Sequence, residues 1–207
     1  MTNMEPVWEE SRRAFHDAAD WYVATVSLVG DRWELPGLGE WSVRDLVGHA
    51  SRSFLTIETY LARPAGSVEI ASPSDYYLAT RAIAAGPDVA QRGRDAAAAL
   101  GADPVAAVQE IAARVRALLD EHDGTALLTT IAGGMRLEDY LPTRTFELVV
   151  HTGDLALALG EPLDAPATAA AQVLGIIGDI ALTDGTAGSL LLLATGRTGL
   201  PGHFSVL

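Results

Sequence analysis

The sequence predicts an all-α fold, and three observations lead to it. Alanine, leucine, arginine and glutamate, which favour helices, dominate the composition, whereas the alternating apolar pattern of strands is scarce. Apolar residues recur at close to 3.6-residue spacing in several long segments. Proline and glycine separate those segments. With 207 residues, of which 49% are hydrophobic, residues 1–207 are expected to form one domain with a substantial core.

Two long amphipathic patterns occupy the first part of the chain. The first predicts a helix over residues 6–29. A Pro- and Gly-rich segment, 31–41, follows and is expected to be an ordered loop held by two tryptophans. The second helix begins at Ser42, which forms a variant of the capping box with Asp45, and it ends at Pro64.

The remaining chain is divided into shorter helices by glycine and proline. These helices are predicted over residues 75–85, 88–100, 104–122, 142–159, 166–183 and 186–194, with a connection over 123–136. The apolar segment 190–194 is expected either to cap the core or to form an interface. A β-hairpin made by LLLLATG and HFSVL is an alternative for the end of the chain.

Composition excludes several classes of protein. The chain has no cysteine, so a disulfide scaffold, a Cys-ligated metal site and a thiol-nucleophile enzyme are excluded. Its net charge is −13 and all 14 basic residues are arginine, which argues against nucleic acid or an anionic membrane as a partner. The acidic start MTNMEPVWEESRR is unlike a signal peptide, and the longest apolar run is too short to span a membrane. We therefore expect a cytoplasmic protein.

One helix carries the candidate chemistry, because it is apolar on nearly every side and still holds four charged or titratable residues in one stripe. Arg144, Glu147, His151 and Asp154 are spaced by 3, 4 and 3 residues, which places them on a single helix face. Buried charges need partners, a metal or a wet cavity. Glu147 and His151 lie one turn apart and can converge on one cation.

Two interpretations of this stripe stay open. It is either a ladder of ion pairs, Arg144 with Glu147 and His151 with Asp154, or part of a metal site that needs a third ligand. His49, at the edge of the buried face of the second helix, is the best candidate for that ligand, although a satisfied core histidine is the simpler alternative. The other histidines are expected to be exposed (His16), at a solvated helix end (His122) or in the tail (His203).

Two motifs make the chain resemble a known family. GEWSVRDLVGHA, residues 39–50, resembles the tryptophan-led helix start that ends in a metal histidine in the DinB-like superfamily. RTFELVVHTGDLALALG, residues 144–160, resembles the second motif of the mycothiol-dependent maleylpyruvate isomerase N-terminal-domain family. DYLPTRTF and the ending LLLATGR…FSVL are also similar, so the likeness extends over most of the chain.

This resemblance implies a DinB-like four-helix bundle with additional C-terminal helices. It also implies a divalent metal, usually zinc, held by His49, Glu147 and His151, with an open position for the thiol of mycothiol or for water. Asp154 is expected to orient a ligand, and Arg144 to bind a carboxylate or to neutralise Glu147. His and carboxylate ligands also suit iron, nickel or manganese.

The function expected from the resemblance is a metal-dependent thiol S-transferase or isomerase. The partners are a small electrophile and a low-molecular-weight thiol, with a monomer or homodimer as the assembly. The characterised isomerase type carries a separate C-terminal α/β domain, for which the segment after residue 194 is too short. This departure argues against maleylpyruvate isomerisation itself and leaves the metal site intact. The alternatives are a non-catalytic metal- or small-ligand-binding bundle and a purely structural helical protein.

Overall fold

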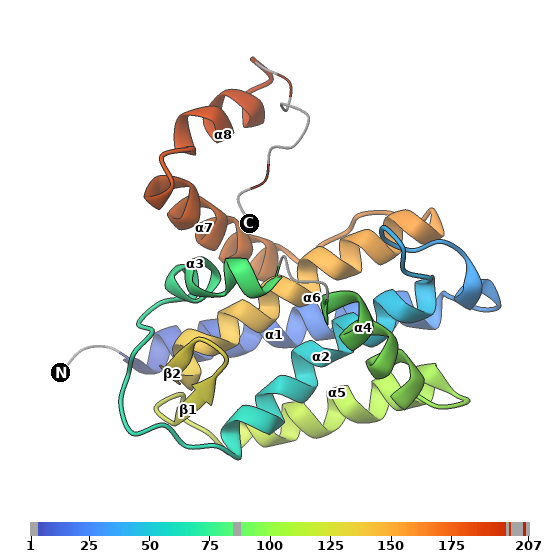
Figure 1. Ribbon diagram of the computed structural model, residues 1–207, viewed down its shortest axis with the longest axis horizontal. Coiled ribbons are helices and arrows are strands. Elements are labelled where there is room, and N and C mark those ends of the chain that lie inside the picture. Colours follow the sequence, from blue (N-terminus) through green and yellow to red (C-terminus); the bar gives the residue numbers. More distant parts are fainter. Residues whose placement is uncertain (1–3, 85–87, 198, 200–204, 206–207) are drawn as a thin grey trace.

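The computed structural model describes residues 4–84, 88–197, 199 and 205, and it confirms the all-α prediction (Figure 1). These residues form eight α-helices, one short 3-10 helix and one two-stranded sheet. The α-helices are α1 (Met4–Ser27), α2 (Val43–Leu61), α3 (Pro73–Ala84), α4 (Asp88–Ala99), α5 (Pro104–Asp120), α6 (Leu137–Leu159), α7 (Ala167–Thr183) and α8 (Ala187–Ala194). The 3-10 helix η1 covers Arg32–Glu34, and the strands are β1 (Leu127–Thr130) and β2 (Gly133–Arg136).

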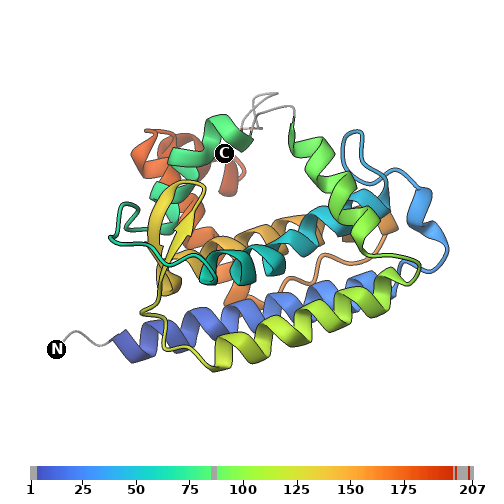
Figure 2. The same cartoon turned by 60° about the horizontal axis from the view of Figure 1, so that its bottom comes forward.

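Helices α1, α5, α2 and α6 form a four-helix bundle in which each packs on the next and α6 closes the ring on α1. Figure 2 shows α1 and α5 side by side beneath α2 and α6. Their inward apolar faces form one continuous core. The largest fully buried side chains include Phe15, Tyr22, Phe54, Leu119, Tyr140 and Leu148.

The start of α2 follows the sequence prediction. Ser42 accepts a hydrogen bond from the Asp45 backbone N–H, and the Asp45 carboxylate accepts one from the Ser42 backbone N–H. Six residues further on, Gly48 allows α4 to approach closely. A Cβ at Gly48 would lie 2.3 Å from the backbone nitrogen of Ala97, so only glycine fits this contact. The tight packing of α4 on α2 holds one wall of the site described below.

The connection predicted over residues 123–136 is wrong in part, because it contains the β1–β2 hairpin. The strands are antiparallel, with Leu127 opposite Arg136 and Thr130 opposite Gly133. The loop after α2 binds both strands: Thr129 N–H donates to the Arg63 carbonyl, and the Gly134 carbonyl accepts from two backbone N–H groups of that loop. The hairpin therefore depends on a segment about 65 residues away in the sequence.

Helix α6 begins at Leu137 rather than at Pro142, which lies inside the helix. The backbone N–H groups of Leu137 and Glu138 donate to the carbonyls of Ala126 and Gly124, so the connection satisfies the first turn without a side-chain cap. Burial of Leu137, Tyr140 and Leu141 stabilises this turn, and α6 therefore extends past the proline. The left-handed Gly160 ends it, as the sequence predicts.

The C-terminal helices lie outside the four-helix bundle. Helix α7 packs on α1 and α6, while α8 contacts α7 and extends away from the bundle (Figure 1). No residue of α8 is buried, and Leu191 is 66% exposed, so α8 does not cap the core. Its helical form also rules out the first strand of the alternative hairpin, whose second strand lies mostly outside the described residues. None of the described helices combines the length and the apolar character that a membrane span requires.

Candidate metal centre

Three potential ligands from two helices meet at the α2–α6 contact. His49 lies on α2, and Glu147 and His151 lie one turn apart on α6. One ligand atom from each residue can be chosen so that all three lie within 4.8 Å of one another. Glu147 Oε2 is 3.3 Å from His151 Nε2, and the two imidazole rings meet edge to face with centroids 4.8 Å apart. The structure thus brings together the three residues for which the sequence predicts a ligand role.

These residues lie at the wall of a cavity of about 650 Å³, large enough for a small organic molecule. Its lining comes from α2, α3, α4 and α6, together with the loop before α2 and the turn of the hairpin. Aromatic side chains make much of the wall. They are Trp41, Tyr60, Tyr76 and Tyr77.

Asp154 fixes the orientation of the His151 ring. Its Oδ2 atom is 3.1 Å from His151 Nδ1, which directs Nε2 toward Glu147. Burial would lower the pKa of His151, but the hydrogen bonds to Asp154 and Glu147 outweigh it and raise the pKa to about 9. His151 is therefore an imidazolium at neutral pH when no metal is bound, and a metal would have to displace its proton.

Glu147 is held as a carboxylate. Burial would raise its pKa, but the hydrogen bond from His151, the charge of Arg144 and a hydrogen bond from Tyr77 lower the pKa to about 2. Tyr77 lies on α3, and its hydroxyl donates to Glu147 Oε1 at 2.9 Å. The sequence interpretation missed Tyr77, because nothing in the local pattern of α3 shows that this residue faces α6.

His49 has an environment that keeps it neutral. The Trp41 indole packs against its ring, with centroids 4.4 Å apart and planes 35° from parallel. Burial and the nearby His151 lower the pKa of His49 to about 4. Its Nδ1 atom is buried without a hydrogen-bond partner among the described residues, which favours a ligand role over that of a satisfied core histidine.

Arg144 does not form the first step of the alternative ion-pair ladder. Within the described part of the chain its guanidinium donates to Thr143 Oγ1 and lies over the rings of Tyr140 and Tyr76, at 4.8 and 5.5 Å from their centroids. Arg144 is only 7% exposed, and it still lines the cavity. Its charge therefore acts on Glu147 through space rather than through an ion pair.

The donor set fits a divalent transition metal. Two imidazole nitrogens and one carboxylate oxygen form the ligand set of open zinc sites, in which a further position is left for water or substrate. His49 is neutral, Glu147 is ionised and His151 is oriented by a carboxylate, so each residue has the state or the partner that a ligand needs.

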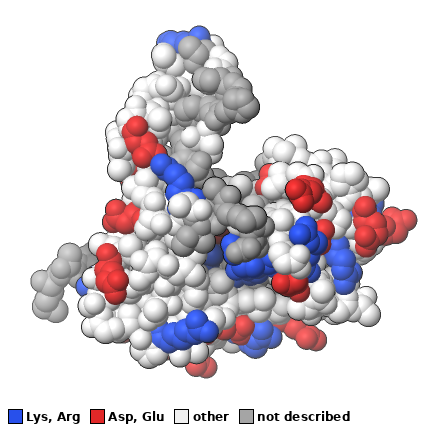
Figure 3. Space-filling view, in the orientation of Figure 1, with Lys and Arg blue, Asp and Glu red and all other residues white. Residues whose placement is uncertain are grey.

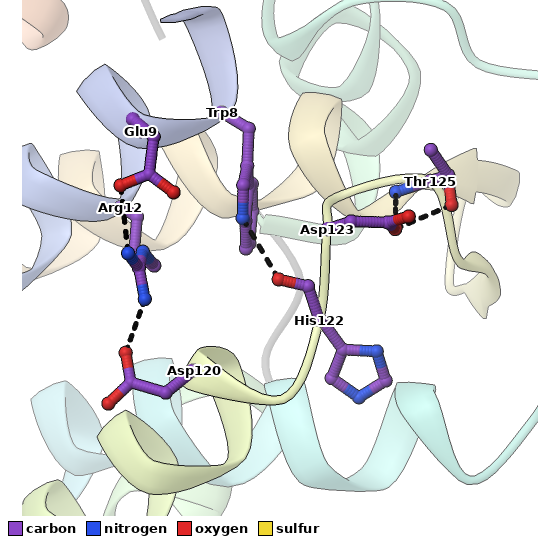
Figure 4. A pocket seen from close by; sticks show the side chains of 7 residues that line it. All are labelled: Trp8, Glu9, Arg12, Asp120, His122, Asp123 and Thr125. Atoms are coloured by element: carbon purple, nitrogen blue, oxygen red, sulfur yellow. Dashed lines mark hydrogen bonds and ion pairs between the residues drawn. The ribbon is translucent and has the colours of Figure 1, made fainter. Parts of the chain in front are cut away.

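A second hollow, of about 460 Å³, lies where the start of α1 meets the end of α5. Among the residues that the structure describes, its lining does not bring together a set of metal ligands like that of His49, Glu147 and His151. Figure 4 shows that its polar groups bind one another: Arg12 bridges Glu9 and Asp120, and the Trp8 indole N–H donates to the His122 carbonyl. The His122 ring points away from these bonds (Figure 4). This hollow is a structural contact between helix ends.

His16 corrects one expectation, because it is half-buried rather than exposed. Its Nε2 atom has no hydrogen-bond partner among the described residues, and burial and the charge of Arg116 lower its pKa. It contacts Phe15 and lies on α1, which does not line the cavity. His203 lies outside the described residues.

Comparison with known families gives a match that covers the site. Residues 12–156 match the family described as mycothiol maleylpyruvate isomerase N-terminal domain, which belongs to the DinB-like superfamily. This range includes His49, Glu147 and His151. Comparisons with curated proteins and with solved structures give no significant match. On the agreement of fold, motif positions and matched length, the chain belongs to the mycothiol maleylpyruvate isomerase N-terminal-domain family.

Proposed function

We propose that this protein is a metal-dependent thiol S-transferase or isomerase that uses mycothiol on a small electrophile, with zinc as the expected metal. The observation that carries the proposal is the convergence of His49, Glu147 and His151, within 4.8 Å, at the wall of a cavity that can hold a small molecule. Membership of a mycothiol-related family supports the choice of thiol.

The protein residues have distinct parts in this proposal. His49, Glu147 and His151 hold the metal. Asp154 orients His151 through the 3.1 Å contact at Nδ1, and Arg144 keeps Glu147 ionised while it presents positive charge to the cavity. Zinc bound here would lower the pKa of a thiol and so supply a thiolate near neutral pH.

The reaction needs no nucleophile from the chain, in keeping with the absence of cysteine. In a transfer, the thiol sulfur forms a bond to the electrophilic carbon, the leaving group departs with its electron pair, and the thiol proton is released. In an isomerisation, addition of the thiol to a double bond permits rotation, and elimination restores the thiol. The aromatic wall and the half-buried ligands would limit the access of water to the thiolate.

The first test measures metal. Protein purified without chelator should contain close to one equivalent of zinc or another divalent metal, and His49→Ala should lose it. His122→Ala is the matched control, because His122 lies at the second hollow and should leave the metal content unchanged. Near-stoichiometric metal in His49→Ala would exclude the three-ligand site, and no metal in the parent protein after zinc is offered would favour a structural role.

The second test measures chemistry. The zinc-loaded protein should accelerate the loss of mycothiol in the presence of chlorodinitrobenzene or a bimane, and a chelator should abolish the acceleration. If the protein binds zinc and a broad panel of electrophiles reacts no faster than without it, the protein is a binding module rather than an enzyme.

A further inference from the structure

The cavity next to the candidate metal centre is positively charged in a chain whose net charge is −13. Among the described residues, its lining includes four of the 14 arginines and a single carboxylate, that of Glu147. In the space-filling view, basic side chains gather near the middle of the face, over α4 and α6, while acidic side chains are spread around it (Figure 3). A local excess of positive charge in an acidic protein marks a place for an anion.

The four arginines differ in whether their charge is already compensated. Arg81 forms an ion pair with Asp184 at 2.5 Å, and the guanidinium of Arg144 lies over two tyrosine rings. Arg52 and Arg92, by contrast, have neither an ion pair nor a hydrogen bond within the described parts of the chain. Both are half-buried, so solvent hydrates them only in part.

Arg52 and Arg92 also lie close enough to act on each other and on the candidate ligand His49. Burial and then the charge of Arg92 lower the pKa of Arg52, and both arginines contribute to the lowered pKa of His49. Arg52 follows His49 by three residues and so shares its face of α2. Arg92 lies on α4, which packs directly on α2.

Two half-buried cations that repel each other, with no counter-ion in the described part of the chain, are unfavourable unless a ligand supplies the negative charge. The planar guanidinium matches a carboxylate, which it binds through two parallel hydrogen bonds. We propose that Arg52 and Arg92 form a carboxylate-binding subsite, which holds an acidic small molecule with its reacting carbon at the metal centre. The link to reaction rests on the proposed function, whereas the binding of carboxylate does not.

The direct test measures carboxylate binding without any metal. Calorimetry of the chelator-treated protein should detect succinate and not its neutral analogue succinamide. In the double variant R52Q/R92Q the Kd for succinate should rise by roughly tenfold to a hundredfold. R94Q is the matched control, because Arg94 lies on the same helix but is exposed and bonded to Gln91. His49→Ala should still bind succinate.

The kinetic test asks whether the two arginines recognise the carboxylate of the electrophile. Iodoacetate and iodoacetamide both transfer carbon to a thiol with loss of iodide, and they differ in one negative charge. R52Q/R92Q should lower kcat/KM for iodoacetate about tenfold and leave that for iodoacetamide unchanged. An equal loss of kcat/KM with both reagents would contradict a subsite for the carboxylate of the electrophile.

Two results would overturn the subsite. One is equal affinity of the parent protein for succinate and succinamide, and the other is an equal loss of succinate binding in R94Q and R52Q/R92Q. Zinc content and the urea midpoint of R52Q/R92Q establish that the variant is folded with its metal site intact, and R52K/R92K should retain part of the affinity. Since succinate binding is measured without metal, its failure is distinguishable from failure of the metal-dependent reaction.

Discussion

Replacing Asp154 by asparagine tests how the chain prepares His151 for a metal. The Asp154 carboxylate contacts His151 Nδ1 at 3.1 Å, so it both orients the ring and favours the imidazolium. These two effects act on zinc affinity with opposite sign. Orientation strengthens binding, since loss of such a partner weakens a metal site by about 10- to 100-fold. The raised pKa weakens binding, because a proton competes with the metal.

The size of the proton competition follows from the pKa of His151, about 9. At about pH 7 the ring is protonated, and its proton reduces zinc affinity about 100-fold, or by about 3 kcal/mol. Zinc affinity of the parent protein should therefore rise about tenfold for each pH unit between about pH 7 and 9 and then level off. The zinc affinity of Asp154→Asn should level off at a lower pH, and its plateau should lie about 10- to 100-fold below that of the parent protein.

The assay is competition for zinc against a chromophoric chelator at a series of pH values, with the pKa of His151 followed by NMR in the zinc-free protein. Asp179→Asn is the control, because it removes the same charge at an exposed position on α7. Its zinc affinity should depend on pH as that of the parent protein does. A parent affinity that is constant between about pH 7 and 9 would refute the proton competition. A plateau for Asp154→Asn equal to that of the parent would refute the orienting role.

Three further outcomes follow from the contacts around the site. Tyr77→Phe removes the hydrogen bond to Glu147, so the pKa of that carboxyl should rise by NMR and zinc affinity should fall by about 1 kcal/mol. Gly48→Ala should lower the free energy of unfolding, measured in urea, by about 1–3 kcal/mol, because the added Cβ would collide with Ala97. Gly175→Ala is the control: Gly175 has open space around it, so this change should raise the free energy of unfolding by about 0.5–1 kcal/mol. A 100-fold excess of zinc over its Kd should stabilise the parent protein by about 2.7 kcal/mol in thermal unfolding, and His49→Ala should show no such shift.

The sequence could predict those features that local pattern determines. The start of α2 follows from Ser42 and Asp45 alone, and the end of α6 follows from Gly160, because caps depend on neighbours within one turn. The spacing of Glu147 and His151 likewise places both on one side of a helix wherever that helix packs. His49 is the best candidate for a third ligand from its place at the edge of the buried face of the second helix, and the resemblance to a known family supports that choice. The local pattern could not show that His49 meets Glu147 and His151, because only packing brings α2 against α6.

Features that depend on contacts between distant segments were missed. The β1–β2 hairpin is short, contains Gly134 in a strand and is held by the loop after α2, none of which a periodic pattern shows. Helix α6 passes through Pro142 because the residues before it are buried, and burial outweighs the local cost of proline. Arg52 could have been noticed from its spacing to His49, but the place of Arg92 depends on how α4 packs.

The stacking of Trp41 on His49 gives the protein a built-in optical probe. Among the described residues of the cavity wall Trp41 is the only indole, while the other three tryptophans of the chain lie elsewhere. Its ring centroid is 4.4 Å from that of His49, so a cation that binds this imidazole changes the field on the adjacent indole. The intrinsic emission of the unlabelled protein should therefore change as the cation binds, and Trp41→Phe should remove the change and keep the metal.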